Sequence, residues 1–313
     1  MPEEIASLPK LIVLLGPTAS GKTGWSLRIA NQINGEIIGA DSRQIYKKMD
    51  IGTAKTPGEW RRNGLRKTFF VGDVPHHMMD IVDPGKMFSV AEFRDNAIKY
   101  TKIAHKAGRI PMLVGGTGLY ISSLVDNLTI PRIEPNRQLR KGLEEKSLEK
   151  LFSLLERMDP EAAKIIDFKN KRRLIRALEV CILSGEPFSG QKQKGQPLFD
   201  VLQIGIEVPK DELYARIDTR VDDMIKQGLV KEVELLIKQK YAWHLSSMSG
   251  IGYKQFKAYF EGTESIDRCI ELLKRDTRRF ARRQMTWFRR NKNIQWCKTF
   301  EEAEKLVQDF LRR

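Results

Sequence analysis

The chain has 313 residues, 41% of them hydrophobic and 30% charged, a composition typical of a globular enzyme with one large domain plus an insertion or second domain. Lysines and arginines number 55 against 40 acids, and the formal charge of +15 indicates a polyanionic partner, nucleic acid before an anionic membrane surface. No stretch approaches the roughly 20 apolar residues of a membrane span, no signal peptide is predicted, and Cys181, Cys269 and Cys297 are too scattered for a zinc site or a disulfide framework, so we expect a cytoplasmic protein.

The first predicted element is a buried parallel strand at Leu11–Leu15. It leads into Gly16-Pro17-Thr18-Ala19-Ser20-Gly21-Lys22-Thr23, which matches the phosphate-binding P-loop found in many ATP- and nucleotide-binding proteins, and a helix is predicted from about 22 to 34. Between a strand and a helix, backbone N–H groups surround phosphate oxygens, Lys22 adds a full charge, and the Thr23 hydroxyl can bind Mg²⁺. The motif predicts a bound diphosphate or triphosphate.

Two more strands are predicted at Glu36–Ala40 and Ile110–Val114, with a helix at Val90–Lys106 that begins with a capping box. Alternating strands and helices, with a P-loop after the first strand, predict a parallel α/β sheet with right-handed crossovers. Ligands of such sheets bind at the carboxyl ends of the strands. Besides the P-loop, two segments fall there: Asp41–Gln44 and Gly115–Gly118.

Asp41 directly follows the second strand and is expected to face the P-loop. Its carboxylate has three possible functions: a base that takes a proton from the attacking group, a magnesium ligand, or a cap of the turn at Ser42 or Gln44. Its position favours the first, by analogy with small-molecule P-loop kinases. The glycines at 115–118, with Thr117, either allow close backbone approach to a ligand or only form the turn into a helix near Leu119.

Residues 126–197 differ in character from the rest of the chain. They contain no strand pattern and end in a polar, flexible stretch at 189–197. Helices are expected near Gln138–Glu145, Leu148–Met158, Pro160–Ile166 and Lys171–Leu183. We therefore predict a P-loop NTPase-like core formed by residues 1–125 and 198–313, with a helical insertion domain at 126–197.

Three groups of arginines are candidate phosphate contacts. Arg172, Arg173 and Arg176 share a helix face in the insertion and are expected to have no acidic partners nearby, although a solvated face explains them nearly as well. After a strand at Val201–Val208, Arg216 and Arg220 could clamp a diphosphate or pair with nearby aspartates. A long helix around 268–292 is the densest basic region and precedes a possible short strand at Ile294–Cys297; its aromatic residues are expected in the core. Its expected backbone-phosphate contacts are Arg278, Arg279, Arg282 and Arg283.

Together these segments resemble the tRNA dimethylallyltransferase family, also called tRNA isopentenyltransferases. The resemblance covers nearly the whole chain in family order, and the P-loop joined to the next two segments is its most specific part. The matching segments are Gly16–Thr23, Asp41–Tyr46, Met49–Lys55, Gly115–Tyr120, Arg173–Glu179, Gly252–Gln255 and Ala281–Arg289.

The resemblance implies transfer of a dimethylallyl group from dimethylallyl diphosphate to N6 of the adenosine just 3′ of a tRNA anticodon. It implies that Asp41 is the base and that Lys22, Thr23 and Arg220 hold the diphosphate with Mg²⁺. It implies a tRNA-binding set of Ser42, Arg43, Gln44, Thr117, Arg172, Arg173, Arg176 and the segment Ser249–Lys254, including Gly252, Tyr253 and Lys254. The chain lacks the ligands of the eukaryotic zinc finger, which indicates a bacterial-type enzyme, and we expect a monomer without zinc.

Two interpretations from other classes compete with this one. A P-loop kinase of a small metabolite explains Lys22 and Asp41, but it leaves the charge of +15, the arginine-rich helix and the insertion without a function. A non-catalytic RNA-binding module explains the charge and leaves the P-loop without one.

Overall fold

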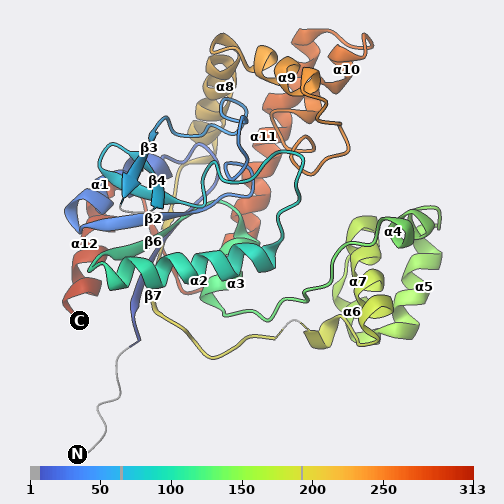
Figure 1. The fold of residues 1–313 in the computed structure, drawn as a ribbon, viewed down its shortest axis with the longest axis horizontal. Helices are drawn as coiled ribbons and strands as arrows, with labels where there is room; N and C mark the ends of the chain where they lie inside the picture. Colours follow the sequence, from blue (N-terminus) through green and yellow to red (C-terminus); the bar gives the residue numbers. More distant parts are fainter. Residues whose placement is uncertain (1–7, 64–65, 192) are drawn as a thin grey trace, which may run out of the picture. The chain divides into compact units, whose positions relative to one another are not determined.

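A computed structural model describes residues 8–63, 66–191 and 193–313. The chain divides into two compact units: one contains the residues up to Val125 together with Leu198–Arg313, and the other is Asp126–Pro197 (Figure 1). The second unit has the limits predicted for the helical insertion. No helix in the described part of the chain is long and apolar enough to cross a membrane.

The first unit is built on a sheet with the strand order β3-β4-β5-β2-β6-β1-β7-β8. Its parallel part confirms the α/β expectation and runs from β5 to β8. The strands of this part are β5 (Val74–His77), β2 (Gly35–Ala40), β6 (Ile110–Gly115), β1 (Lys10–Leu15), β7 (Asp200–Ile206) and β8 (Ile294–Cys297).

Three strands were not predicted. β3 (Glu59–Asn63) and β4 (Arg66–Val71) form an antiparallel pair at one edge of the sheet, and β4 pairs with β5 in the same sense. β3 reads Glu-Trp-Arg-Arg-Asn, which has no apolar alternation, and β5 is only four residues long and contains Pro75. The edge strand β3 needs no buried face on both sides, and β5 is too short to show a clear period, so both carry a weak sequence signal.

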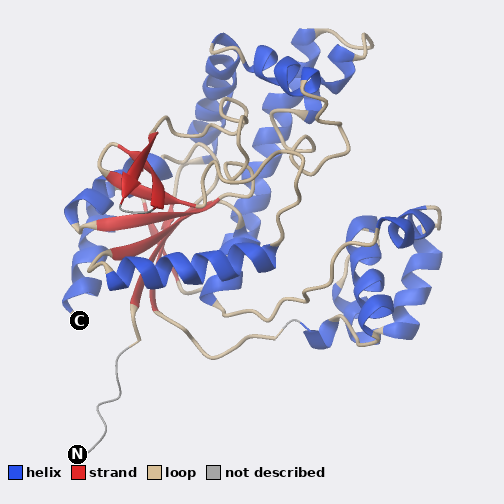
Figure 2. Ribbon diagram, in the orientation of Figure 1, coloured by secondary structure: helices blue, strands red, loops and turns tan. Residues whose placement is uncertain are grey.

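Helices cover both faces of the sheet (Figure 2). Along β1, Leu11, Val13 and Leu15 pack on one side, in the cluster that also contains residues of α2 (Val90–Lys106) and α3 (Gly118–Val125). Ile12 and Leu14 point to the opposite side and pack with α1 (Lys22–Gln32) and α12 (Phe300–Arg312). This alternation produces three layers and leaves the carboxyl ends of the strands for a site.

The C-terminal half of the first unit is helical, as predicted. It contains α8 (Lys210–Lys226), α9 (Leu229–Lys238), the 3-10 turn η2 (Lys254–Phe256), α10 (Lys257–Phe260) and α11 (Ile266–Phe288). The helix α11 packs against α8 and also reaches α3, at the end of the sheet where the P-loop lies. It is therefore placed to contribute residues to the site.

The second unit is a small helical bundle with its own core. It contains α4 (Arg137–Glu144), α5 (Leu148–Met158), α6 (Pro160–Ile165), α7 (Lys171–Ser184) and the short η1 (Ser189–Gln191). Each of its four α-helices begins at a capping residue whose side chain accepts a backbone N–H: Asn136, Ser147, Asp159 and Asn170. Fully buried Leu151, Leu155, Leu174 and Leu178 form the centre of its core.

Candidate active site

The P-loop connects β1 to α1 as expected. Gly21 is the N-cap of α1 and has φ of 92°, a left-handed conformation that a residue with a side chain adopts only with strain. The side chain of Ser20 is buried in the loop, and its hydroxyl oxygen has no hydrogen-bond partner in the described part of the chain. A buried hydroxyl of this kind needs a polar partner, and a phosphate oxygen would provide one.

Lys22 lies inside the loop. Its Nζ donates to the carbonyl oxygens of Gly16 at 3.0 Å and Pro17 at 2.6 Å. Burial lowers the pKa of the Lys22 ammonium to about 8, while the negative charge of Asp41 acts to raise this pKa and the positive charge of Arg220 to lower it. The electrostatic coupling shows that the structure brings together three predicted site residues from β1–α1, β2 and α8.

Arg220 is a half-buried cation without an acidic partner among the described residues, and burial lowers its pKa. The aspartates that could have paired with it are engaged elsewhere, since Asp218 binds Arg278 and Asp222 binds Lys274. Arg216 forms an exposed pair with Glu212 instead. Of the two arginines considered as a diphosphate clamp, only Arg220 is available.

Asp41 begins the turn after β2, and its two carboxylate oxygens differ. Oδ1 accepts the backbone N–H groups of Arg43 at 2.8 Å and Gln44 at 3.4 Å, which is the turn-capping function considered from the sequence. Oδ2 has no hydrogen-bond partner in the described ranges. Thr117 secures the turn from the neighbouring strand end, because its Oγ1 accepts the Ser42 N–H at 3.0 Å. One oxygen therefore orients the carboxylate and the other stays available for chemistry.

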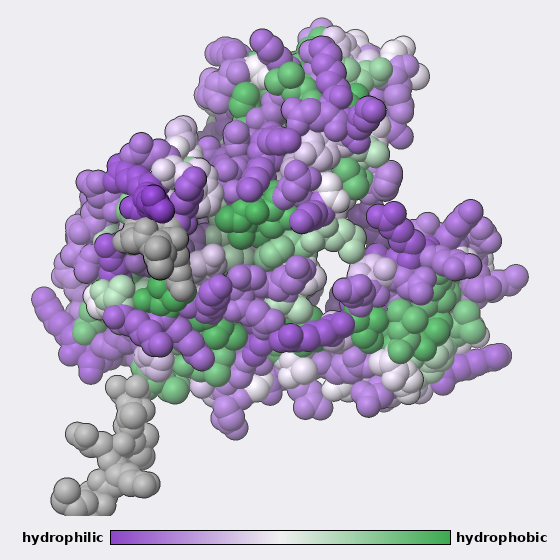
Figure 3. Space-filling view, viewed as in Figure 1, coloured by the Kyte–Doolittle hydropathy of each residue, from purple (hydrophilic) through white to green (hydrophobic). Residues whose placement is uncertain are grey.

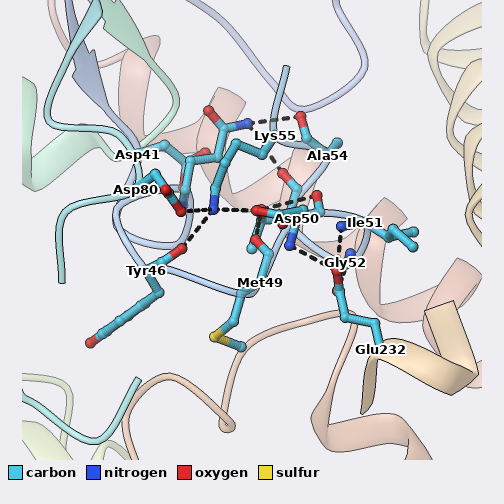
Figure 4. Close-up of polar contacts among 12 residues, drawn as sticks. Asp41, Tyr46, Met49, Asp50, Ile51, Gly52, Ala54, Lys55, Asp80 and Glu232 are labelled. Atoms are coloured by element: carbon cyan, nitrogen blue, oxygen red, sulfur yellow. Dashed lines mark hydrogen bonds and ion pairs between the residues drawn. The ribbon is translucent and has the colours of Figure 1, made fainter. Parts of the chain in front are cut away.

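The segment Met49–Lys55 folds against this turn (Figure 4). The Gln44 side-chain amide donates to the carbonyl oxygens of Thr53 at 3.1 Å and Ala54 at 3.0 Å. The buried Lys55 side chain forms ion pairs with Asp50 and Asp80 and donates to the Tyr46 carbonyl oxygen at 2.7 Å. These contacts give the matching segment Met49–Lys55 a structural function: it supports the turn that carries Asp41.

Glu232 of α9 was not predicted and completes this support (Figure 4). Its carboxylate accepts three successive backbone N–H groups, from Asp50 at 2.9 Å, Ile51 at 2.8 Å and Gly52 at 3.0 Å, and the Tyr253 hydroxyl at 2.7 Å. Successive N–H groups form an anion-binding concavity, which here holds a side chain of the same protein. No local sequence signal reveals a contact across 180 residues.

The structure corrects the prediction for Tyr253. Its side chain is fully buried, with the hydroxyl on Glu232, and burial raises its pKa well above the ordinary value. Gly252 is also buried, against the Gly52 carbonyl oxygen. Of the three residues predicted here to contact tRNA, only Lys254 is exposed.

The arginines of α7 separate in the same way. Arg172 and Arg173 are exposed, but Arg176 binds the buried carboxylate of Glu179 at 2.6 Å and the Ile133 carbonyl oxygen at 3.0 Å. The expectation that this face has no acidic partner is wrong for Arg176. Burial acts to raise the pKa of Glu179, but the hydrogen bonds from Arg140 and Arg176 hold it below its ordinary value.

Along α11 the arginines also fall into two sets. Arg278 is bound to Asp218 and Arg279 lies 4.0 Å from Asp276, so the prediction of few nearby acids is wrong for this part of the helix. Exposed arginines without an ion pair in the described part of the chain follow: Arg282, Arg283, Arg289 and Arg290. Phe288 is buried as expected of a core residue, whereas Trp287 is 40% exposed and packs beside Gly118.

A strand–P-loop–helix unit, a carboxylate at the next strand end and an unpaired arginine, on a three-layer sheet, define a P-loop-like α/β enzyme. A family model described as IPP transferase matches residues 44–291. The chain therefore belongs to the IPP transferase family, which confirms the resemblance drawn from its motifs.

Similar proteins match over nearly the whole length. A tRNA dimethylallyltransferase of Acetivibrio thermocellus is 43% identical over 311 residues, which cover 96% of both chains, and one from a Roseiflexus species is 45% identical over 289 residues, covering 91% of both. The solved structure of the tRNA isopentenylpyrophosphate transferase of Bacillus halodurans is 36% identical with a TM-score of 0.68, covering 97% of this chain and 95% of that one. A eukaryotic dimethylallyltransferase solved acting on tRNA is 28% identical, with a TM-score of 0.72, covering 90% of this chain and 70% of that one.

Proposed function

We propose that the protein transfers a dimethylallyl group from dimethylallyl diphosphate to N6 of the adenosine immediately 3′ of a tRNA anticodon, and releases diphosphate. The observation that carries this proposal is the meeting of three groups at one end of the sheet: the P-loop lysine Lys22, the unpaired cation Arg220 and the half-engaged carboxylate of Asp41. Membership of the IPP transferase family and the names of the relatives support it.

The P-loop would bind the diphosphate of the substrate. As the C1–O bond of the substrate breaks, negative charge grows on the departing diphosphate oxygens. The Lys22 ammonium, the Arg220 guanidinium and the loop N–H groups would stabilise that charge, and the unpartnered Ser20 hydroxyl offers a further donor. These are charges and dipoles held in place by the fold before the substrate arrives, which lowers the cost of reorganisation during the reaction.

Magnesium fits this site on the diphosphate. Mg²⁺ is usually held by one or two protein oxygens together with substrate phosphates and water. The Thr23 side chain is exposed at the start of α1, and its hydroxyl has no hydrogen-bond partner in the described ranges, so it would hold the ion. When bound there, the metal would neutralise charge on the leaving group.

The turn after β2 would contact the target adenosine. The N6 amine of adenine is a weak nucleophile, and it loses a proton as its new bond to C1 forms. Asp41 would accept that proton on Oδ2 while Arg43 N and Gln44 N hold Oδ1. Ser42 and Thr117 lie beside it and would contact the target base, which must leave the anticodon-loop stack to reach this position.

The RNA itself would be held by exposed cations, namely Lys254 and Arg282 in the first unit and Arg172 and Arg173 in the second. These residues would contact backbone phosphates, which give affinity without selecting sequence. The three cysteines are free and buried, in keeping with work in a reducing cytoplasm, and we propose a zinc-free monomer there.

One experiment tests the function and separates it from a kinase. Unmodified tRNA is incubated with the protein and dimethylallyl diphosphate, or with ATP, and its nucleosides are analysed by mass spectrometry. We expect one adenosine to gain a C5H8 unit with dimethylallyl diphosphate only. The melting temperature of the protein should rise when tRNA or dimethylallyl diphosphate is added. An unmodified tRNA together with protection by ATP alone would overturn the proposal.

A further inference from the structure

Gln284 of α11 joins two loops of the site. Its side chain is 7% exposed, and its Oε1 accepts the N–H of Thr18 in the P-loop at 2.8 Å. Its Nε2 donates to the carbonyl oxygen of Gly116, at the end of β6, also at 2.8 Å. We infer that Gln284 is a positioning residue that holds the P-loop and the Gly115–Gly118 turn in the arrangement the transfer requires. The inference rests on the proposed function.

The chemistry of the two partners selects glutamine. Thr18 N–H can only donate and Gly116 C=O can only accept, so one side chain must present an acceptor and a donor at its two ends. A carboxylate would face the Gly116 carbonyl oxygen with a second acceptor, and an ammonium would face Thr18 N–H with a second donor. Without Gln284, the buried Gly116 carbonyl and the partly buried Thr18 N–H would lose these partners.

The glycines of the turn match this arrangement. A Cβ on Gly116 would meet Gln284 Nε2 at 2.3 Å, and a Cβ on Gly118 would meet the Trp287 ring at 2.3 Å. The sequence suggested two functions for these glycines, close approach to a ligand or a simple turn into a helix. The structure adds a third: they allow α11 to approach the end of the sheet. No side chain larger than hydrogen fits at either position without displacing α11 residues.

The bridge connects the two substrate sides of the site. Thr117 follows Gly116, donates its backbone N–H to Ala40 and fixes Ser42 through its hydroxyl, beside Asp41. Thr18 lies in the loop that would hold the diphosphate. A shift of the Gln284 amide would thus alter the distance between leaving group and base, and misplacement by about 1 Å costs on the order of 100-fold in rate.

The test replaces Gln284 with methionine, which keeps the length of the side chain and removes both hydrogen bonds. We expect Gln284→Met to bind inorganic diphosphate about tenfold more weakly in calorimetry and to slow single-turnover transfer by about 10- to 100-fold. Affinity for tRNA should remain within about twofold, because the exposed arginines of α11 are unchanged. The matched control is Gln203→Met, which removes a glutamine 5% exposed and bonded to Asn291, away from the P-loop.

A second pair of variants displaces the same amide without removing it. Gly116→Ala should reproduce the losses of Gln284→Met, whereas Gly142→Ala in α4, where a Cβ meets nothing within 4 Å, should behave as wild type. If Gln284→Met lowers the melting temperature as Gln203→Met does but leaves diphosphate affinity and single-turnover rate unchanged, Gln284 is only structural. Affinity for inorganic diphosphate is measured without catalysis. A wild-type protein that transfers no dimethylallyl group would therefore refute the proposed function, while the effect of Gln284 on diphosphate binding could still be determined.

Discussion

At the scale of single residues, a substitution of Asp41 can separate the orientation of its side chain from its action as a base. Asp41→Asn keeps an oxygen that can accept the Arg43 N–H and removes the basic oxygen. We expect turnover to fall by roughly two to four orders of magnitude, the usual contribution of a general base, with tRNA affinity unchanged. Single-turnover kinetics at saturating substrates measures this. Turnover close to that of wild type would show that another group takes the proton.

The pKa of Lys22 predicts a pH dependence for diphosphate binding. Because burial lowers this pKa to about 8, the free protein loses the Lys22 proton as pH rises through 8, well before an ordinary lysine would. Affinity for dimethylallyl diphosphate should be full below pH 8 and fall by up to about tenfold per pH unit above it. Lys22→Arg is the control: its side chain stays charged, so titration of Lys22 is removed and any remaining slope belongs to other groups. Equal pH profiles for the two proteins would contradict the prediction.

At the scale of elements, α9 supports the loop at residues 50–52 through one carboxylate. Glu232→Gln replaces an acceptor oxygen by an NH₂ group facing backbone N–H groups, so we expect a loss of about 2–3 kcal/mol in the free energy of unfolding. Glu234→Gln on the same helix removes only an exposed pair with Lys238 and should cost at most about 0.5 kcal/mol. Urea unfolding of both variants measures the difference, and equal losses would mean that the three N–H contacts contribute little.

The elements also show why the sequence predicted some features and not others. β1 is apolar from Leu11 to Leu15, β2 is apolar from Ile37 to Ala40, and the P-loop is a local motif, so the sheet core and the positions of Lys22 and Asp41 follow from a few adjacent residues. The β3–β4 pair has no such pattern. Contacts such as Arg278–Asp218, 60 residues apart, depend on how helices meet, and neither sequence spacing nor composition reports that. Sequence therefore overestimated how many arginines are free, and missed Glu232 and Gln284.

At the scale of the whole molecule, the charge of +15 is spread over a largely hydrophilic surface, of which Figure 3 shows one face. The pairing of arginines decides where that charge can act on RNA. Arg278 is paired with Asp218, and Arg176 shares the single buried carboxylate of Glu179 with Arg140. Arg282 and Arg283 are exposed and have no acidic partner in the described part of the chain, although the Arg283 guanidinium lies over the ring of Phe280. The effective RNA-binding charge is therefore smaller and more localised than the composition indicates.

This difference gives a prediction for salt dependence. Phosphate contacts release counterions, so each lost contact should reduce the slope of log affinity against log salt by about 0.7–0.9 units. Arg282→Ala/Arg283→Ala should therefore flatten the slope by roughly 1.5 units and weaken cognate and non-cognate tRNAs alike, because backbone contacts do not read sequence. Arg278→Ala removes the same kind of side chain from the same helix. Because the Arg278 guanidinium is already paired with Asp218, the slope should stay as in wild type. The tRNA affinities of the wild type, the double variant and Arg278→Ala are measured across a salt series. A slope changed by Arg278→Ala and not by the double variant would mean that the ion pair with Asp218 opens on RNA and that the exposed pair lies outside the contact surface.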